Sequence, residues 1–412
     1  MDYGHPEQDR IAKAPSLGVL IAISTVSPLA MQIYLPSLAG MMIVFSASAG
    51  EIQLSMSAYF IALAISQLFW GPLSDQFGRR PVIIAGMALF VSATVWCLFA
   101  PSIEWLIAAR VVQAAGGSAG IVLARAIVRD LYGPAQAASR IGYVMMGMAV
   151  MPTIAPALGG VLDQYYGWQG GFVLLLLIGV GVFVTSYLSL PETNLVRSSA
   201  GFGRAFRAYR ILMGEPLFWS YALTASFSAL TYFAYLGGAP FIAAQLLSLS
   251  AAEMGLYFML VAIGYIVGNF LSGKFSERVG LYPMIISGTL LSVLCVALMG
   301  GLAYAGVVTA TSIFLPMFVL GLGNGICLPS TISGAVSVRP EHAGSASGLV
   351  ASMQVGWGAA AGTLVAWLFA GSFLAGSVWS MILIMMFGAA ANLVAALAIK
   401  RASAAQRLVP AE

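Results

Sequence analysis

Arg110 and Gln113 lie in AARVVQAAGGSAG, residues 108–120, a stretch that is otherwise apolar or small. Arginine keeps its charge at any ordinary pH, and its guanidinium can hold acceptors on another helix or a polarised ligand. On a helix, Arg110 and Gln113 share one face with Gly117. A lipid-facing arginine costs about 2.5–3.5 kcal/mol, so we expect Arg110 to face the protein interior. The alternative is a purely structural side chain that extends outward past Glu104.

A second polar group lies in the loop GPLSDQFGRRP, residues 71–81. Its aspartate can accept hydrogen bonds from an arginine or meet a helix N-terminus, and its glycines permit a tight turn and close helix approach. This chemistry suits a gate. The alternative is an ordinary basic cytoplasmic loop, which would explain the two arginines but not the two glycines and the aspartate together. The candidate residues are Gly71, Asp75, Gly78, Arg79 and Arg80.

The elements that must position these residues are membrane helices. Of the 412 residues, 60% are hydrophobic and only 8% are charged, whereas about a quarter are charged in an average soluble protein. Twelve apolar stretches, each long enough to cross a bilayer, follow one another from Ser16 to Ile399. The sequence therefore predicts an all-α polytopic membrane protein. The first stretch continues to Phe45 without a cleavage site, so we expect a retained span.

Several classes of site are not indicated. The 3 cysteines are far apart in the sequence and lie in or at the edge of apolar spans. We therefore expect them to pack in the interior, and we expect neither a disulfide framework nor a metal site. The 2 histidines, His5 and His342, lie outside the spans, and no catalytic set or nucleotide-binding loop is present. We expect no cofactor, no metal and no enzymatic activity. Nucleic-acid binding is not expected either, because no basic groove lies outside the membrane.

The basic residues set the orientation. Of the 18 lysines and arginines, all except Arg110 fall in loops or tails on one side of the predicted spans. The positive-inside rule makes this side cytoplasmic, with both termini there.

The chain is an internal repeat. The longest polar break, 192–215, is expected to be a cytoplasmic linker between two six-helix halves, 1–191 and 216–412. An offset of 202 residues places GPLSDQFGRRP on GKFSERVGLYP, residues 273–283, without a gap. Such repeats are typical of secondary transporters with a binding site near the membrane midplane.

These motifs resemble the major facilitator superfamily, in its twelve-helix drug/proton antiporter form. The loop 71–81 resembles the superfamily's loop motif, and RVVQAAGG, residues 110–117, resembles the fourth-span motif of proton-linked exporters. MPTIAPALGG, residues 151–160, resembles the fifth-span antiporter motif, with Ala155 in place of a glycine. The matching residues of that third motif are Pro152, Pro156, Gly159 and Gly160.

Three further segments resemble the bicyclomycin and chloramphenicol resistance subfamily, Bcr/CflA: YLPSL (34–38), ARAIVRDLYG (124–133) and WQGGF (168–172). The resemblance implies a proton-coupled exporter of small hydrophobic or mildly polar drugs in the bacterial inner membrane, surrounded by lipid and acting as a monomer. The alternative is a transporter of the same fold for a metabolite such as a sugar or an amino acid. A channel, receptor or membrane enzyme fits less well.

One position departs from the subfamily. Its members commonly carry a first-span aspartate before the tyrosine-leucine-proline segment, and here Gln32 stands in that place. By the topology above, the 14 acidic residues are cytoplasmic or, for Glu51, Glu104, Asp163 and Glu253, at the outer ends of spans. Arg110 therefore has no evident carboxylate partner, and we expect it to bind Gln32, Gln113 or backbone carbonyls. Asp75 and Asp163 remain candidates for carrying a proton.

Polar and aromatic residues on the inner spans are the candidates for a substrate cavity, because aromatic and methionine side chains adapt to varied apolar ligands. They are Gln32, Tyr34, Tyr59, Arg110, Gln113, Tyr143, Met146, Tyr232, Tyr235, Tyr265, Asn269 and Gln354.

Overall fold

The computed structural model describes residues 14–47, 49–194, 202–249, 251–371, 374 and 376–408, and these residues form helices and no strand. The all-α prediction is therefore confirmed. In chain order the elements are α1 (Leu17–Gln32), η2 (Leu35–Ser37), α2 (Leu38–Val44), α3 (Ala49–Phe77), α4 (Arg79–Leu98), α5 (Ile103–Leu131), α6 (Pro134–Tyr166), α7 (Gln169–Ser189), α8 (Phe202–Met213), α9 (Pro216–Phe241), η3 (Ile242–Leu246), α10 (Ala251–Val279), α11 (Leu281–Tyr304), α12 (Ala310–Phe314), α13 (Pro316–Ser337), η4 (Pro340–His342), α14 (Ala343–Gly371) and α15 (Trp379–Leu408).

Within the described residues, eleven helical segments are long and apolar enough to cross a membrane. The seventh predicted span corresponds to α9, which is 26 residues long but is not among the eleven. The helix α9 carries several buried hydroxyl side chains, among them Ser226, Ser228 and Thr231.

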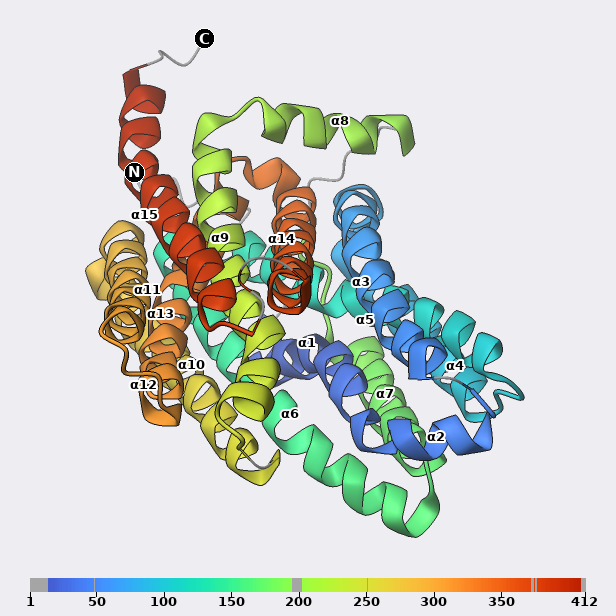
Figure 1. Ribbon diagram of the computed structural model, residues 1–412. Coiled ribbons are helices and arrows are strands. Elements are labelled where there is room, and N and C mark those ends of the chain that lie inside the picture. The colour runs from blue at the N-terminus through green and yellow to red at the C-terminus, as the bar shows by residue number, and fades with distance from the viewer. Residues whose placement is uncertain are drawn as a thin grey trace, which may run out of the picture. The chain divides into compact units, whose positions relative to one another are not determined.

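The chain divides into two compact units, and the first comprises residues 1–132, 154–208 and 340–348. Its central helix is α5, which packs against α1, α3 and α4 (Figure 1), while α7 packs against α4 and α1. Glycines on α5 allow this close approach. A Cβ added at Gly116 would lie 2.5 Å from the amide nitrogen of Phe90, and one at Gly120 would overlap the carbonyl oxygen of Ile23.

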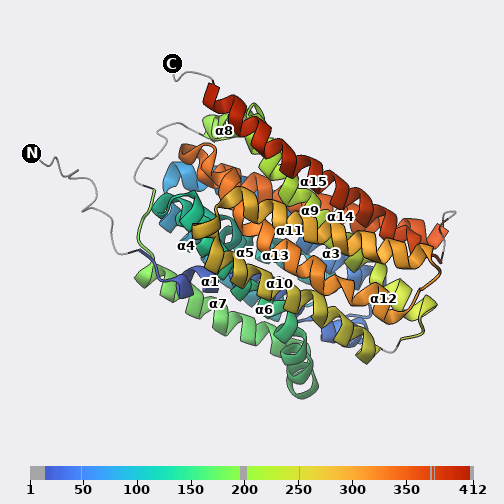
Figure 2. The same ribbon diagram turned by 90° about the vertical axis from the view of Figure 1, so that its left-hand side faces the viewer.

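The second unit comprises residues 133–153, 209–339 and 349–412. Its central helix is α13, which packs against α9, α10 and α11, while α15 packs against α9 and α11 (Figure 2). Two G-x-x-x-G pairs form the α10–α13 contact. A Cβ at Gly264 or Gly268 would overlap backbone atoms of α13, and one at Gly321 or Gly325 would overlap backbone atoms of α10.

The repeat is visible in matched turns. Gly78 has φ 103° and immediately precedes α4, and Gly280 has φ 86° and immediately precedes α11. These two residues coincide at the offset of 202 found in the sequence. Glycine adopts this backbone conformation without steric cost, so each turn reverses the chain between two long helices.

The first apolar stretch, which continues to Phe45, is not one continuous helix. The α-helix α1 ends at Gln32 and is followed by the 3-10 helix η2 and the short helix α2. Pro36, within η2, has no N–H to donate and disfavours helical geometry in the residue before it. The break leaves carbonyl groups in the last turn of α1 without helical partners.

The linker predicted at 192–215 contains α8 and lies partly outside the described residues. The basic residues Arg10, Lys13 and Arg197, used above for orientation, also lie outside them. The division into halves 1–191 and 216–412 stays a prediction.

The α10–α13 contact leads to a stability prediction. Gly321→Val should lower the thermal midpoint of the detergent-purified protein, because overpacking typically costs about 1–3 kcal/mol. Gly301→Val in α11 is the matched control, since no atom lies within 4 Å of a Cβ added there. Fluorescence-detected size exclusion after heating measures both. Equal midpoints for the two variants would contradict the packing described.

Candidate functional site

Arg110 is fully buried in the middle of the first unit. Its Nη1 donates hydrogen bonds to the carbonyl oxygen of Ala30 at 2.9 Å and to Oε1 of Gln113 at 2.7 Å. The first bond joins α5 to α1, and the second joins two residues three positions apart on α5. The interior position expected from the sequence is therefore what the structure has.

The acceptor on α1 exists because that helix ends early. Ala30 lies in the last turn of α1, where carbonyl oxygens lose their partners four residues ahead. The C-terminal end of a helix also carries a partial negative charge, which attracts a cation. The guanidinium of Arg110 therefore supplies both a hydrogen-bond donor and a compensating charge to the break in the first span.

Two tyrosine rings flank the same guanidinium. The central carbon of the guanidinium lies 4.2 Å from the ring centre of Tyr34 and 4.1 Å from that of Tyr59. At these distances a cation is attracted to the aromatic faces. Ser27 fixes one ring, since the hydroxyls of Tyr59 and Ser27 are 2.9 Å apart.

Gln113 is also fixed from its other side. Its Nε2 donates to Oγ1 of Thr94 on α4 at 2.8 Å, and that hydroxyl donates to the carbonyl oxygen of Phe90 at 2.7 Å. With its amide nitrogen used in this way, Gln113 presents its oxygen to Arg110. We call Arg110, Gln113, Tyr34, Tyr59 and Ala30 the arginine cluster.

The arginine cluster contains no carboxylate. Within the described part of the chain, Nε and Nη2 of Arg110 have no hydrogen-bond partner. Gln32 is half-buried and is not among the residues that Arg110 binds. Of the partners expected from the sequence, Gln113 and a backbone carbonyl are present, and two nitrogen atoms of the guanidinium, Nε and Nη2, remain available to an acceptor.

A second buried cluster surrounds Asp75 in the loop motif. Its carboxylate accepts hydrogen bonds from the amide nitrogens of Gly344 and Ser345 at 3.1 and 2.9 Å, and from the Ser345 hydroxyl at 2.6 Å. Both partners lie in the first turn of α14, so the carboxylate occupies a helix N-terminus. Gly71 makes room for this contact, because a Cβ there would overlap the Gly344 carbonyl.

Arg79 joins this cluster to α5. It forms ion pairs with Asp75 through Nη1 and with Asp130 through Nε, the latter at 2.9 Å. Nη1 also donates to the Ser74 hydroxyl at 2.7 Å. Arg80 points elsewhere, and its Nη2 donates to the carbonyl oxygen of Tyr187 at 2.8 Å.

The residues after α7 complete the cluster and were not assigned a role from the sequence. The Glu192 carboxylate accepts hydrogen bonds from the amide nitrogens of Arg79 and Arg80 at 2.9 and 3.2 Å, which satisfies the free N-terminus of α4. Nδ2 of Asn194 donates to the carbonyl of Asp75 at 3.0 Å. We call Asp75, Arg79, Asp130, Glu192, Asn194, Gly344 and Ser345 the loop network.

Asp130 and Glu192 were missed for an identifiable reason. Asp130 lies within the motif ARAIVRDLYG, where it marked only the subfamily, and Glu192 was the first residue of a presumed linker. A clue to Asp130 was available, since it is an acid among several arginines. Glu192 is separated from Arg79 by 113 residues, so no local pattern connects them.

The antiporter motif lies in α6, and its glycines pack against the broken first span. A Cβ at Gly159 would overlap the carbonyl oxygen of Ile33, and one at Gly160 would lie 3.8 Å from Cβ of Pro36. Pro156 is half-buried in the same helix, and the side chain of Pro152 lies outside the described residues.

The remaining cavity candidates lie in the second unit. Tyr143 packs on Gly273 of α10, where a Cβ would approach its ring to 2.8 Å, and Met146 is half-buried one turn further along α6. Nδ2 of Asn269 donates to the carbonyl of Tyr265 at 2.7 Å, and its buried Oδ1 has no partner within the described residues.

Tyr235 occupies an apolar core instead of a polar pocket. It is fully buried, and its ring centre lies 5.2 Å from that of Phe258 and 6.2 Å from that of Phe314. Tyr232 and Gln354 are half-buried, on α9 and α14. No hydrogen bond or ring contact joins these three residues within the described part of the chain.

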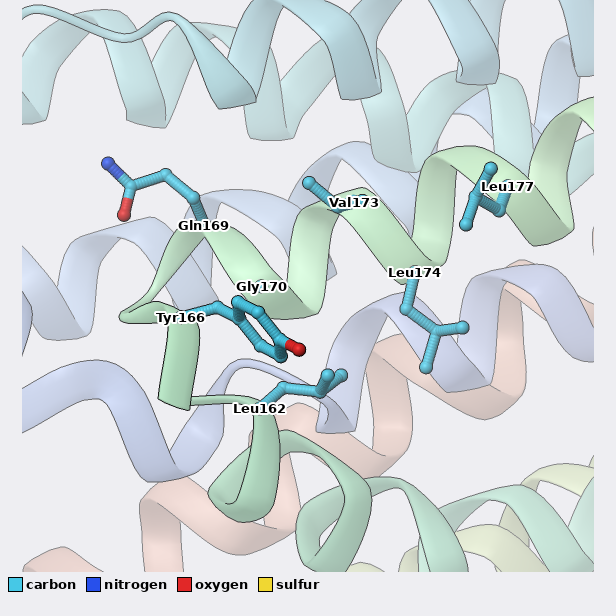
Figure 3. Close-up of a pocket in the computed structure, with 7 residues that line it drawn as sticks. All are labelled: Leu162, Tyr166, Gln169, Gly170, Val173, Leu174 and Leu177. Atoms are coloured by element: carbon cyan, nitrogen blue, oxygen red, sulfur yellow. The ribbon is translucent and has the colours of Figure 1, made fainter. Parts of the chain in front are cut away.

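One hollow lies along α14 and another lies between α6 and α7. The first, of about 360 Å³, is lined by Met353, Gly356, Trp357 and Ala360. The second, of about 270 Å³ (Figure 3), has walls that are apolar except for Gln169 and the hydroxyl of Tyr166. Neither contains a residue of the arginine cluster.

Comparison with known proteins gives a consistent result. The family model described as Major Facilitator Superfamily matches residues 20–363. Multidrug resistance protein D of Escherichia coli (strain K12) is 32% identical over 342 residues, which are 82% of this chain and 84% of that protein.

A bicyclomycin resistance protein homolog of Haemophilus influenzae is 26% identical over 358 residues, 85% of this chain and 88% of that protein. The crystal structure of the human organic anion transporter MFSD10 (TETRAN) has the same fold, with a TM-score of 0.73 at 18% identity, covering 96% of this chain and 100% of that one.

The loop network leads to a prediction about the first turn of α14. Asp75→Asn should speed hydrogen exchange at the amides of Gly344 and Ser345, because the amide side chain offers them one neutral acceptor in place of a carboxylate. Breaking a buried ion pair typically costs about 3–5 kcal/mol, so the thermal midpoint should fall as well. Glu341→Gln, an exposed acid just before α14, is the control and should change neither measurement. Unchanged exchange in the Asp75 variant would contradict the assignment.

Proposed function

Because the chain belongs to the major facilitator superfamily, we propose that it is a secondary active exporter of small hydrophobic or mildly polar drugs that works by alternating access. The observation that carries this proposal is the fully buried Arg110–Gln113 pair on α5, in a chain 32% identical to a multidrug resistance protein over most of both lengths. Similarity to a bicyclomycin resistance protein homolog supports the Bcr/CflA subfamily predicted from the motifs.

In this proposal the arginine cluster is the polar part of the substrate site. Nε and Nη2 of Arg110 can donate to an acceptor on the drug, such as a carbonyl or hydroxyl oxygen. The rings of Tyr34 and Tyr59 cover the guanidinium, so an acceptor reaches it when one ring moves. Those rings also offer apolar surface to the remainder of the ligand.

The loop network acts as the gate. Asp75 and Arg79 hold the ends of α3, α4 and α5 together with the first turn of α14, and these contacts must break and re-form if α14 moves during transport. Asp75→Asn is therefore expected to slow transport more than it weakens drug binding.

Proton coupling is part of the proposal, and its carrier differs from the subfamily pattern. No carboxylate contacts Arg110 within the described residues, and Gln32 cannot titrate. We therefore place the coupling proton on a carboxylate at a membrane edge, Asp75 or Asp163. The protein is further proposed to act as a monomer in a bacterial inner membrane, with both termini in the cytoplasm.

A drug-susceptibility panel tests the function. Expression in cells that lack their main efflux pumps should raise tolerance to chloramphenicol-like or bicyclomycin-like compounds. Arg110→Ala should abolish the effect while the protein still inserts, and Arg110→Lys should restore part of it, because an ammonium cannot reproduce the guanidinium fork. Tolerance unchanged by any antibacterial, together with efflux of a sugar or amino acid, would favour the metabolite alternative. Full activity of the alanine variant would leave Arg110 with a structural role only.

The first-span position gives a separate prediction. Gln32→Asp should make export depend more strongly on the pH gradient and should favour cationic over neutral substrates, since it adds a titratable acid on the helix that Arg110 binds. Efflux from proteoliposomes at fixed voltage and varied pH gradient measures this, with Gln32→Asn as the uncharged control. Strict proton antiport in the native protein that survives both Asp75→Asn and Asp163→Asn would place the coupling proton elsewhere.

A further inference from the structure

The helix α8 is short, basic and amphipathic. Residues 193–214 contain four arginines and no lysine, aspartate or glutamate. Three of these arginines, Arg204, Arg207 and Arg210, fall on α8 at intervals of three, which places their positions along one side of the helix. With 12 residues α8 extends about 18 Å, too short to cross a bilayer.

The two sides of α8 differ in exposure. Ala208 and Leu212, four residues apart, are 4% and 0% exposed, so this stripe packs against the protein. Arg207 and Arg210 are exposed, and next to them Ile211 and Met213 are 37% and 55% exposed. Arginines beside exposed apolar side chains are typical of a helix lying at a membrane surface.

The end of α8 is tied to the start of a predicted membrane span. Nε1 of Trp219, in the first turn of α9, donates to the carbonyl oxygen of Met213 at 2.8 Å. Figure 1 shows α8 turning away from the direction of α9 at this junction. Tryptophan is enriched at the boundary between headgroups and acyl chains, and we expect Trp219, with Met213 beside it, to lie at that boundary.

The described acid next to α8 is already paired with another arginine. The acid that follows α8 in the sequence, Glu215, accepts hydrogen bonds from the guanidinium of Arg339, with Nε at 2.8 Å. Within the described residues, neither Arg207 nor Arg210 forms an ion pair. Their guanidinium groups are therefore free to make paired hydrogen bonds to a phosphate group.

We propose that α8 is a binding site for anionic phospholipids. Arg207 and Arg210 bind the phosphate groups, and Ile211 and Met213 reach the start of the acyl-chain layer. The occupant is a lipid and not a soluble anion, because the exposed apolar side chains lie beside the arginines. The site lies outside the substrate site proposed above and stands whether or not the chain exports drugs.

Lipid titration of the detergent-purified full chain tests the proposal. Native mass spectrometry should show tighter binding of phosphatidylglycerol than of phosphatidylcholine. Each arginine near a surface contributes about fivefold to the affinity for anionic lipid, so R207Q/R210Q should weaken phosphatidylglycerol binding by about 25-fold. R207K/R210K should retain most of the binding.

The matched control is K400Q/R401Q, which removes two exposed charges from α15 and should leave the affinity for phosphatidylglycerol within about twofold. An equal loss in the control would overturn the proposal, since the effect would then follow net charge. Inorganic phosphate that displaces phosphatidylglycerol, or equal binding of the two lipids by the native chain, would also overturn it. If R207Q/R210Q fails to fold, the proposal is still tested by comparing how tightly the native chain binds phosphatidylglycerol and phosphatidylcholine.

Discussion

A permanent positive charge buried in an apolar bundle is the constraint on which the first unit depends. Arg110 cannot be neutralised by losing its proton, and isolated burial of a charge is costly. The structure offsets this cost with a helix end, two aromatic faces and a fixed amide. The helix end, the two rings and the amide can contact the guanidinium only if the helices that carry them pack closely around α5. Gly116 and Gly120 supply the space, because larger residues there would hold α4 and α1 away from α5.

The second buried arginine shows a different solution to the same problem. Arg79 is 1% exposed, and two carboxylates, Asp75 and Asp130, balance it. One of them also accepts hydrogen bonds from the N-terminus of α14, so a single carboxylate satisfies both a cation and a helix end. The arginine cluster is built from a backbone carbonyl, an amide and two rings, and within the described residues it contains no such counter-ion.

Much of this arrangement follows from the sequence. The fold class follows from hydropathy, the matched turns at Gly78 and Gly280 from the internal repeat, and the Arg110–Gln113 contact from helical spacing. The early end of α1 was not predicted, although Pro36 signals it, because hydropathy continues unchanged to Phe45. Hydropathy reports the environment of a segment and says little about its backbone hydrogen bonds.

Contacts between residues far apart in the sequence could not be predicted from local sequence patterns. Glu192 satisfies the N-terminus of α4 from a position 113 residues away, and nothing in its neighbours distinguishes it from an ordinary loop acid. Tyr235 has the sequence context of a cavity residue, yet it packs with Phe258 and Phe314. Which side of a membrane helix faces the core and which faces a cavity depends on neighbours that periodicity alone does not identify.

The way in which Arg110 is held explains why the chain can carry Gln32 where its relatives commonly have an aspartate. If a first-span acid were needed to keep Arg110 buried, its replacement by glutamine would leave an uncompensated charge. Here the carbonyl of Ala30 and the partial charge of the α1 terminus already serve that purpose, and they depend on the helix ending at Gln32, not on which side chain ends it. Burial of the arginine and titration by an acid are thus separable tasks. A chain of this fold can lose the second and keep the first, provided that Pro36 and the glycines of α5 and α6 preserve the break and the close approach around it.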